Sequence, residues 1–80
     1  MTNDEFFAFC DKHQLGLSFA YEHRYIDNKK KIVVCIDSAN TTTRLLITKG
    51  RDTYQEAIEA CKEFAKEFED AGFDIYKRYY

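Results

Sequence analysis

Residues 17 to 26 alternate between two kinds of side chain, and this alternation constrains the fold more than any other feature of the chain. A period of two is typical of a β-strand, whose successive side chains point to opposite faces. Asp27 and Asn28 follow with turn chemistry, and a second strand is predicted over about residues 30 to 37. The sequence therefore predicts an antiparallel hairpin. One face of its first strand would carry Leu17, Phe19, Tyr21, His23 and Tyr25.

The second strand does not alternate, because every residue from 32 to 36 is apolar. A hairpin loop with an even number of residues would place Tyr21 on the same face as Ile32 and Val34. We expect this register, because it gathers the larger apolar set beneath the helices. Val33 and Cys35 would then point to the opposite face.

A third strand is predicted over residues 42 to 49, after a turn at residues 38 to 41. Its alternation places Leu45 and Ile47 in the core and Leu46 on the opposite face. The three strands would form an antiparallel meander.

A first helix is predicted over about residues 3 to 14. Thr2 and Glu5 have capping-box spacing at its start, and Gly16 is expected to end it.

A second helix is predicted from about Thr53 to Ala71, because apolar residues recur there at intervals of three and four. Gly72 is expected to cap its end. The tail from residue 73 to 80 alternates weakly, which predicts a short fourth strand at an edge. The predicted fold is therefore α+β, a two-layer α-β-β-β-α sandwich with both helices on one face of the meander.

The length of 80 residues predicts a single domain over residues 1 to 80. Charge is uneven: residues 23 to 51 hold seven bases and two acids, a balance of +5, whereas residues 52 to 70 hold two bases and seven acids, a balance of −5. No basic start precedes an apolar run, and no segment reaches the roughly 20 apolar residues of a membrane span. We expect a cytoplasmic protein without a membrane partner.

The predicted helix-free face of the sheet carries a small apolar island with charged residues around it. Such a surface is typical of a binding or self-association site. We expect it to bind another protein or a second copy of this chain, as a homodimer. The expected protein-binding residues are Ala20, Val33, Cys35, Leu46, Arg24, Lys31 and Arg44.

Nucleic-acid binding through the basic hairpin and the tyrosine-rich tail is the alternative, and we expect it less. Lysines would contact phosphates and tyrosines would stack on bases. The net charge of −2 and the acidic second helix disfavour it. The expected contacts are Lys29, Lys30, Lys31, Tyr25, Tyr79 and Tyr80.

The order helix, three strands, helix resembles that of the double-stranded RNA-binding domain. That family contacts phosphates with a lysine-rich start to its second helix. Here the same place reads GRDTYQEAIEACKEF, with Asp52 and Glu56 where bases would be needed. The resemblance therefore extends to the fold order and not to RNA binding.

The segment TYQEAIEACKEFAKEF, from Thr53 to Phe68, resembles the closing helix of many short proteins of bacteriophages and mobile elements. Most of these have no assigned function. The resemblance implies a small accessory protein that acts by binding a host or phage macromolecule.

The sequence does not indicate a catalytic site or a metal-binding site. The chain has no glycine-rich phosphate loop, and in the expected register Cys35 and His23 lie on different faces. Cys10 and His13 share a helix face, but no C-x-x-C pair accompanies them, and the three cysteines lie among apolar neighbours. We expect reduced core thiols, no metal, no cofactor and no enzymatic activity.

Overall fold

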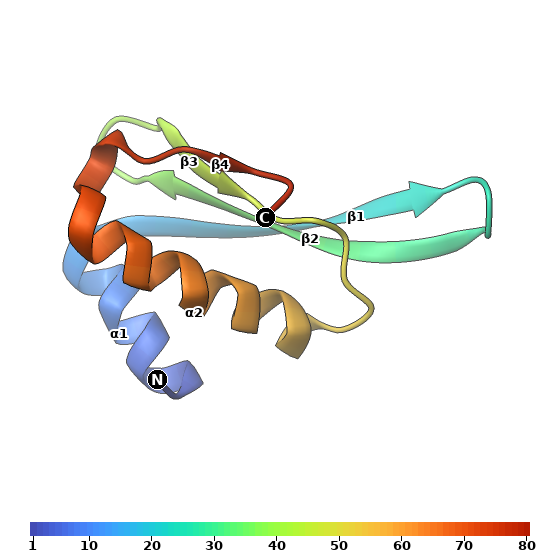
Figure 1. Cartoon of the computed structure of the whole chain (residues 1–80), viewed down its shortest axis with the longest axis horizontal. Helices are drawn as coiled ribbons and strands as arrows, with labels where there is room; N and C mark the ends of the chain where they lie inside the picture. Colours follow the sequence, from blue (N-terminus) through green and yellow to red (C-terminus); the bar gives the residue numbers. More distant parts are fainter.

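The computed structural model describes residues 1 to 80 and contains one four-stranded sheet with both helices on one of its faces (Figure 1). The strands lie in the order β1-β2-β3-β4; the first three are antiparallel and β4 runs parallel to β3. The predicted α+β order is therefore confirmed. The elements are α1 (Asn3–His13), β1 (Leu15–Arg24), β2 (Lys29–Ser38), β3 (Arg44–Ile47), α2 (Tyr54–Ala71), a 3-10 turn (Gly72–Asp74) and β4 (Lys77–Arg78).

The start of α1 is the predicted capping box. The Thr2 hydroxyl accepts a hydrogen bond from the Glu5 backbone N–H, and the Glu5 carboxylate accepts one from the Thr2 N–H. The helix ends at His13 because Gln14 adopts a left-handed conformation with φ of 54°. Gly16 lies within β1, so the prediction that it ends the helix is wrong.

The start and end of α2 follow the sequence closely. Thr53 accepts a hydrogen bond from the Glu56 N–H, and Gly72 ends the helix with φ of 66°. A residue with a side chain is strained at such a φ, which explains the glycine.

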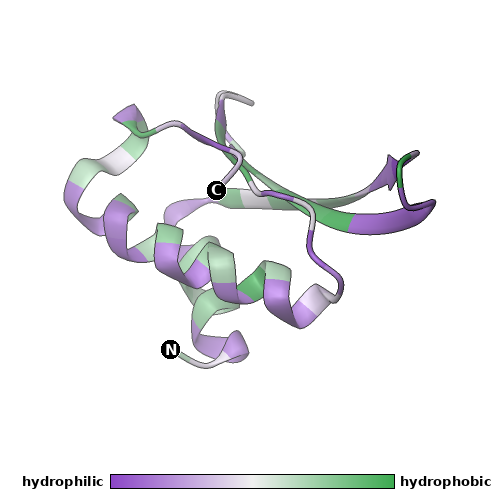
Figure 2. Ribbon diagram, turned by 45° about the vertical axis from the view of Figure 1, so that its right-hand side comes forward, coloured by the Kyte–Doolittle hydropathy of each residue, from purple (hydrophilic) through white to green (hydrophobic).

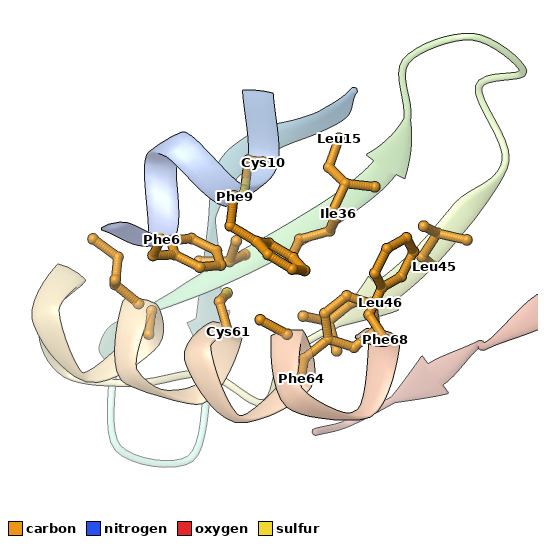
Figure 3. Packing of buried hydrophobic residues seen from close by; sticks show 14 of the residues in the cluster. Phe6, Phe9, Cys10, Leu15, Ile36, Leu45, Leu46, Cys61, Phe64 and Phe68 are labelled. Carbon is orange, nitrogen blue, oxygen red and sulfur yellow. The ribbon is translucent and has the colours of Figure 1, made fainter. Parts of the chain in front are cut away.

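The core lies between the helices and the sheet (Figure 3). Aromatic rings of both helices meet aliphatic side chains of the strands there. Removing this apolar area from water is the main favourable contribution to folding, at roughly 25 cal/mol per Å². Its fully buried large side chains are Phe6, Phe64, Ile36, Leu45, Leu46, Val34 and Cys61.

The pairing of β2 with β3 differs from the prediction. Leu46 lies opposite Ile36 and Ile47 lies opposite Cys35, and the register shifts between Ile36 and Asp37. Such a bulge lets Leu45 and Leu46, which are neighbours in sequence, both enter the core. The placement of Leu46 on the helix-free face is therefore wrong, and Ile47 takes that place.

The β1–β2 hairpin extends well past the start of α2 (Figure 1). The two strands pair without a shift from Leu15 and Ser38 to Arg24 and Lys29, across a four-residue loop. The predicted even loop and its register are confirmed, because Tyr21 lies opposite Ile32.

The helices do not reach the outer half of this hairpin. Phe19 and Tyr21, which the alternation placed under the helices, are 44% and 65% exposed. The expectation that they are buried is therefore wrong. No helix in the structure has the length and apolar character needed to cross a membrane.

Candidate interaction surfaces on the hairpin

Five ring-bearing side chains lie together on the helix side of the hairpin, where no helix covers them. Phe19 meets Tyr54 edge to face, with ring centroids 5.4 Å apart and planes at 72°. The hydroxyl groups of Tyr21 and Tyr54 are 2.8 Å apart and share a hydrogen bond. The rings of His23 and Tyr25 lie 4.8 Å apart. We call this set the hairpin aromatic surface: Phe19, Tyr21, His23, Tyr25 and Tyr54.

Strand geometry and helix position together create this surface. The odd-numbered residues of β1 face the helix layer, and the hairpin carries them beyond it. Tyr54 is the first residue of α2, so its ring fills the corner between the helix end and the hairpin. The hydrogen bond between the two hydroxyls raises the pKa of Tyr54.

The tip of the hairpin carries two exposed apolar side chains next to Asp27 and Asn28, and it has basic residues beside it. Ile26 is 97% exposed and Tyr25 is also fully in solvent. Lys30 lies on the helix side with its Nζ 6.0 Å from the centre of the Tyr21 ring. Figure 2 shows the hydrophobic colour at the tip between hydrophilic strand ends.

The helix-free face offers less apolar surface than expected. Ala20 is exposed, but Val33 and Cys35 are only half-exposed. Leu46 is buried on the other side, and the half-exposed Ile47 lies beside Cys35 instead.

The three cations among the expected protein-binding residues already have carboxylate partners. Arg44 Nε lies 2.9 Å from Asp37, which raises the pKa of the guanidinium. Lys31 bonds to Asp52 and lowers the pKa of that carboxyl. Arg24 lies 3.8 Å from Asp27 across an exposed turn. Of the three cations, only Lys31 has a largely buried side chain.

The predicted nucleic-acid contacts divide between the two faces. Lys29 and Lys31 project from the helix-free face, and Lys30 projects from the helix side. Tyr79 lines a hollow on the helix-free face with Glu22, Arg24, Lys31, Lys49 and Gly50.

Tyr80 does not belong to this exposed set. Its ring packs against Phe64, 6.5 Å away between centroids, and burial raises its pKa to about 12. The expectation that Tyr80 offers an exposed stacking surface is wrong.

The sequence pattern missed the most exposed part of the candidate site. Phe19, Tyr21 and Tyr54 follow apolar periodicities that indicate burial, and Ile26 lies in the loop. The one sequence feature that indicates this exposure is the length of the first strand. β1 has ten residues and extends beyond the helix layer, which covers only its first half.

Buried thiols are poor nucleophiles in this fold. Burial raises the pKa of Cys10 to about 11 and that of Cys61 to about 12, so both remain neutral thiols. No group of three or more histidine, cysteine or acidic side chains lies close enough together to hold a metal ion.

No protein-family model matches this chain, and no curated protein or solved structure matches it either.

Proposed function

We propose that this chain is a small binding module that acts by protein–protein contact through the hairpin aromatic surface. The observation that supports the proposal is the group of exposed rings beyond the helix layer, with Tyr21 at 65% exposure and Phe19 and Tyr54 both near half exposed. Contiguous exposed apolar surface on a small domain indicates a contact site.

The chemistry of the surface suits a protein partner. Tyrosine and phenylalanine lose little conformational entropy when a partner covers them, because each has only two side-chain torsions. The hydrogen bond between Tyr21 and Tyr54 and the edge-to-face contact of Phe19 hold the rings in place before binding. Lys30 and Asn28 supply polar groups around the rings, and Asn28 is bonded to His23.

The proposal includes a cytoplasmic setting, no cofactor and no catalytic role. The resemblance of Thr53 to Phe68 to closing helices of phage and mobile-element proteins supports an accessory role of this kind.

Affinity capture from native lysate, quantified by mass spectrometry, tests the proposal. We expect the recovered amount of a protein captured by the tagged wild-type chain to fall at least 10-fold when Tyr21 is changed to Ala. Truncating a central aromatic residue of an interface typically costs about 2 kcal/mol, or roughly 30-fold in Kd.

Two variants serve as controls for this capture. Tyr54→Phe keeps the ring and removes only the hydroxyl, so capture should fall less than with Tyr54→Ala. Tyr76→Ala removes a tyrosine of similar exposure that lies outside the hairpin, and capture should be unchanged. Equal recovery of every partner by wild type and Tyr21→Ala, with both folded by circular dichroism, would refute the proposal.

Nucleic-acid binding is the second candidate, and the hollow on the helix-free face favours it. Arg24, Lys31 and Lys49 converge there beside the ring of Tyr79. Cations beside an aromatic ring are the usual elements of a site for single-stranded nucleic acid. Glu22 also lines the hollow, and Asp52 bonds Lys31, so fewer free cations are present than the sequence suggests.

A further inference from the structure

The outer edge of β1 is unpaired over its whole length. β1 spans ten residues, from Leu15 to Arg24, and its only strand partner is β2. No side chain of the protein bonds to the backbone groups of this strand on its free side. An edge of this kind is a ready template for another strand.

The hydrogen bonds of β2 show which β1 residues point outward. Val34 exchanges bonds with Thr48, and Ile32 exchanges bonds with Arg51, so these two residues direct their backbone groups away from β1. Their partners across β1 are Phe19 and Tyr21. In an antiparallel ladder both residues of such a pair point away from each other, so the N–H and C=O groups of Phe19 and Tyr21 point to the free edge.

The opposite edge of the same sheet is protected. β4 has only two residues, and both are basic, Lys77 and Arg78. Short edge strands and positive charges are the usual means of preventing strand addition. β1 lacks this protection over residues 15 to 21: the strand is long and regular, it contains no proline, and no residue in that range is charged.

We infer that the β1 edge pairs with the β1 edge of a second copy, antiparallel and about a two-fold axis at Ala20. In this register Phe19 of one copy faces Tyr21 of the other, and these residues exchange backbone hydrogen bonds. Ala20 faces its own counterpart, with side chains on the helix-free face. The two four-stranded sheets become one continuous sheet.

The register is self-complementary in charge and shape. Glu22 faces Ser18 and Arg24 faces Gly16, so no like charges meet across the new ladder. The axis is perpendicular to the sheet, so the helices of both copies lie on the same side. The Phe19 and Tyr21 rings of the two copies then join into one aromatic surface. Cross-strand aromatic pairs of this kind stabilise antiparallel ladders.

Disulfide trapping tests the inference at the axis. In a Cys35→Ser background, Ala20→Cys places two thiols opposite each other, at a Cα separation of about 4.5 Å that suits a disulfide. We expect a covalent dimer under mild oxidation. Val33→Cys in the same background is the matched control, because Val33 lies beside Ala20 on the same face but in an interior strand, and it should stay monomeric.

Solution mass provides an independent measurement. We expect the mass of the wild type measured by sedimentation to rise from 9.5 kDa towards twice that value as the concentration rises. A Kd on the order of 10 µM is expected for so small an interface. Phe19→Pro removes an outward-facing N–H and breaks no hydrogen bond within the chain. It also removes the ring that contacts Tyr54, and it should remain folded and monomeric.

A wild-type chain that stays monomeric up to about 500 µM, or Ala20→Cys that crosslinks no faster than Val33→Cys, would overturn the inference. Self-association through the β1 edge is distinct from the partner binding proposed above. Tyr54 contacts the side chains of Phe19 and Tyr21 but lies on α2 and supplies no backbone group to the new ladder, so Tyr54→Ala should abolish partner capture while leaving the crosslink unchanged. The two proposals can therefore fail separately.

Discussion

Cys10 and Cys61 are buried thiols whose ionisation opposes folding. Both lie in the core between α1 and α2, and burial is the main cause of their raised pKa values. A thiolate in an apolar core loses its hydration without gaining a partner. The folded protein therefore retains protons that the unfolded chain releases.

The stability of the protein is expected to fall as the pH rises above about 9. The Cys61 thiol loses its proton near the ordinary value of 9.0 in the unfolded chain but only near 12 in the folded one. The unfolded state binds fewer protons in this range, so the free energy of unfolding decreases with pH, by roughly 1 kcal/mol between pH 9 and pH 10. Urea unfolding at pH 7, 9 and 10 measures this decrease.

Cys61→Ala provides the comparison for this residue. The variant should be less stable at pH 7 because of the cavity, yet its stability should depend less steeply on pH above 9. The same pH slope in both proteins would show that Cys61 does not carry the effect.

At the scale of elements, the hairpin and the chain that follows β3 approach unusually closely at Gly50. A Cβ added to Gly50 would lie 2.5 Å from the Cβ of Lys31, which real structures essentially never show. The missing side chain lets Arg51 reach Ile32 and extend the ladder beyond the end of β3. Gly50 thus anchors the loop before α2 to the hairpin.

Gly50→Ala is expected to destabilise the protein by about 1–3 kcal/mol, because the strand must shift away from Lys31. Gly16→Ala is the control: its nearest atom, the Asp37 carbonyl oxygen, lies 3.7 Å from the added carbon, and stability should change by less than about 1 kcal/mol. Chemical denaturation of the two variants measures the difference. Equal effects would refute the close-contact explanation.

At the scale of the whole molecule, charge divides the surface. The basic residues from 23 to 51 occupy the sheet and its hairpin, and the acidic residues from 52 to 70 lie mainly on α2. A polyanion is attracted to one side and repelled by the other, and salt screens the attraction as well as the repulsion. The arrangement predicts weak nucleic-acid binding that depends steeply on salt.

We expect retention on a single-stranded oligonucleotide column only at low ionic strength. Changing both Lys29 and Lys49 to Glu should abolish retention, because both project from the helix-free face. Lys66→Glu changes an exposed base on α2 and should have little effect. Retention that persists at 0.3 M salt would favour nucleic acid as the main partner, and loss with Lys66→Glu would show a nonspecific charge effect.

Local chemistry explains why most elements were predictable. The capping residues Thr2 and Thr53, the glycine cap at Gly72 and the alternation of β1 each act within a few residues, so their signals are complete in the sequence. The even loop also followed from the sequence, because only that register gathers the apolar residues of both strands on one face.

The candidate site depended on relations that no local pattern contains. Leu46 exchanged places with Ile47 because a bulge forms only when β3 is fitted against β2. Phe19 and Tyr21 became exposed because the helices end before the hairpin does. The sequence by itself determined which residues of β1 and β2 pair and which face they share. Only the tertiary structure decided which part of that face is covered, because coverage depends on where separate elements end relative to one another.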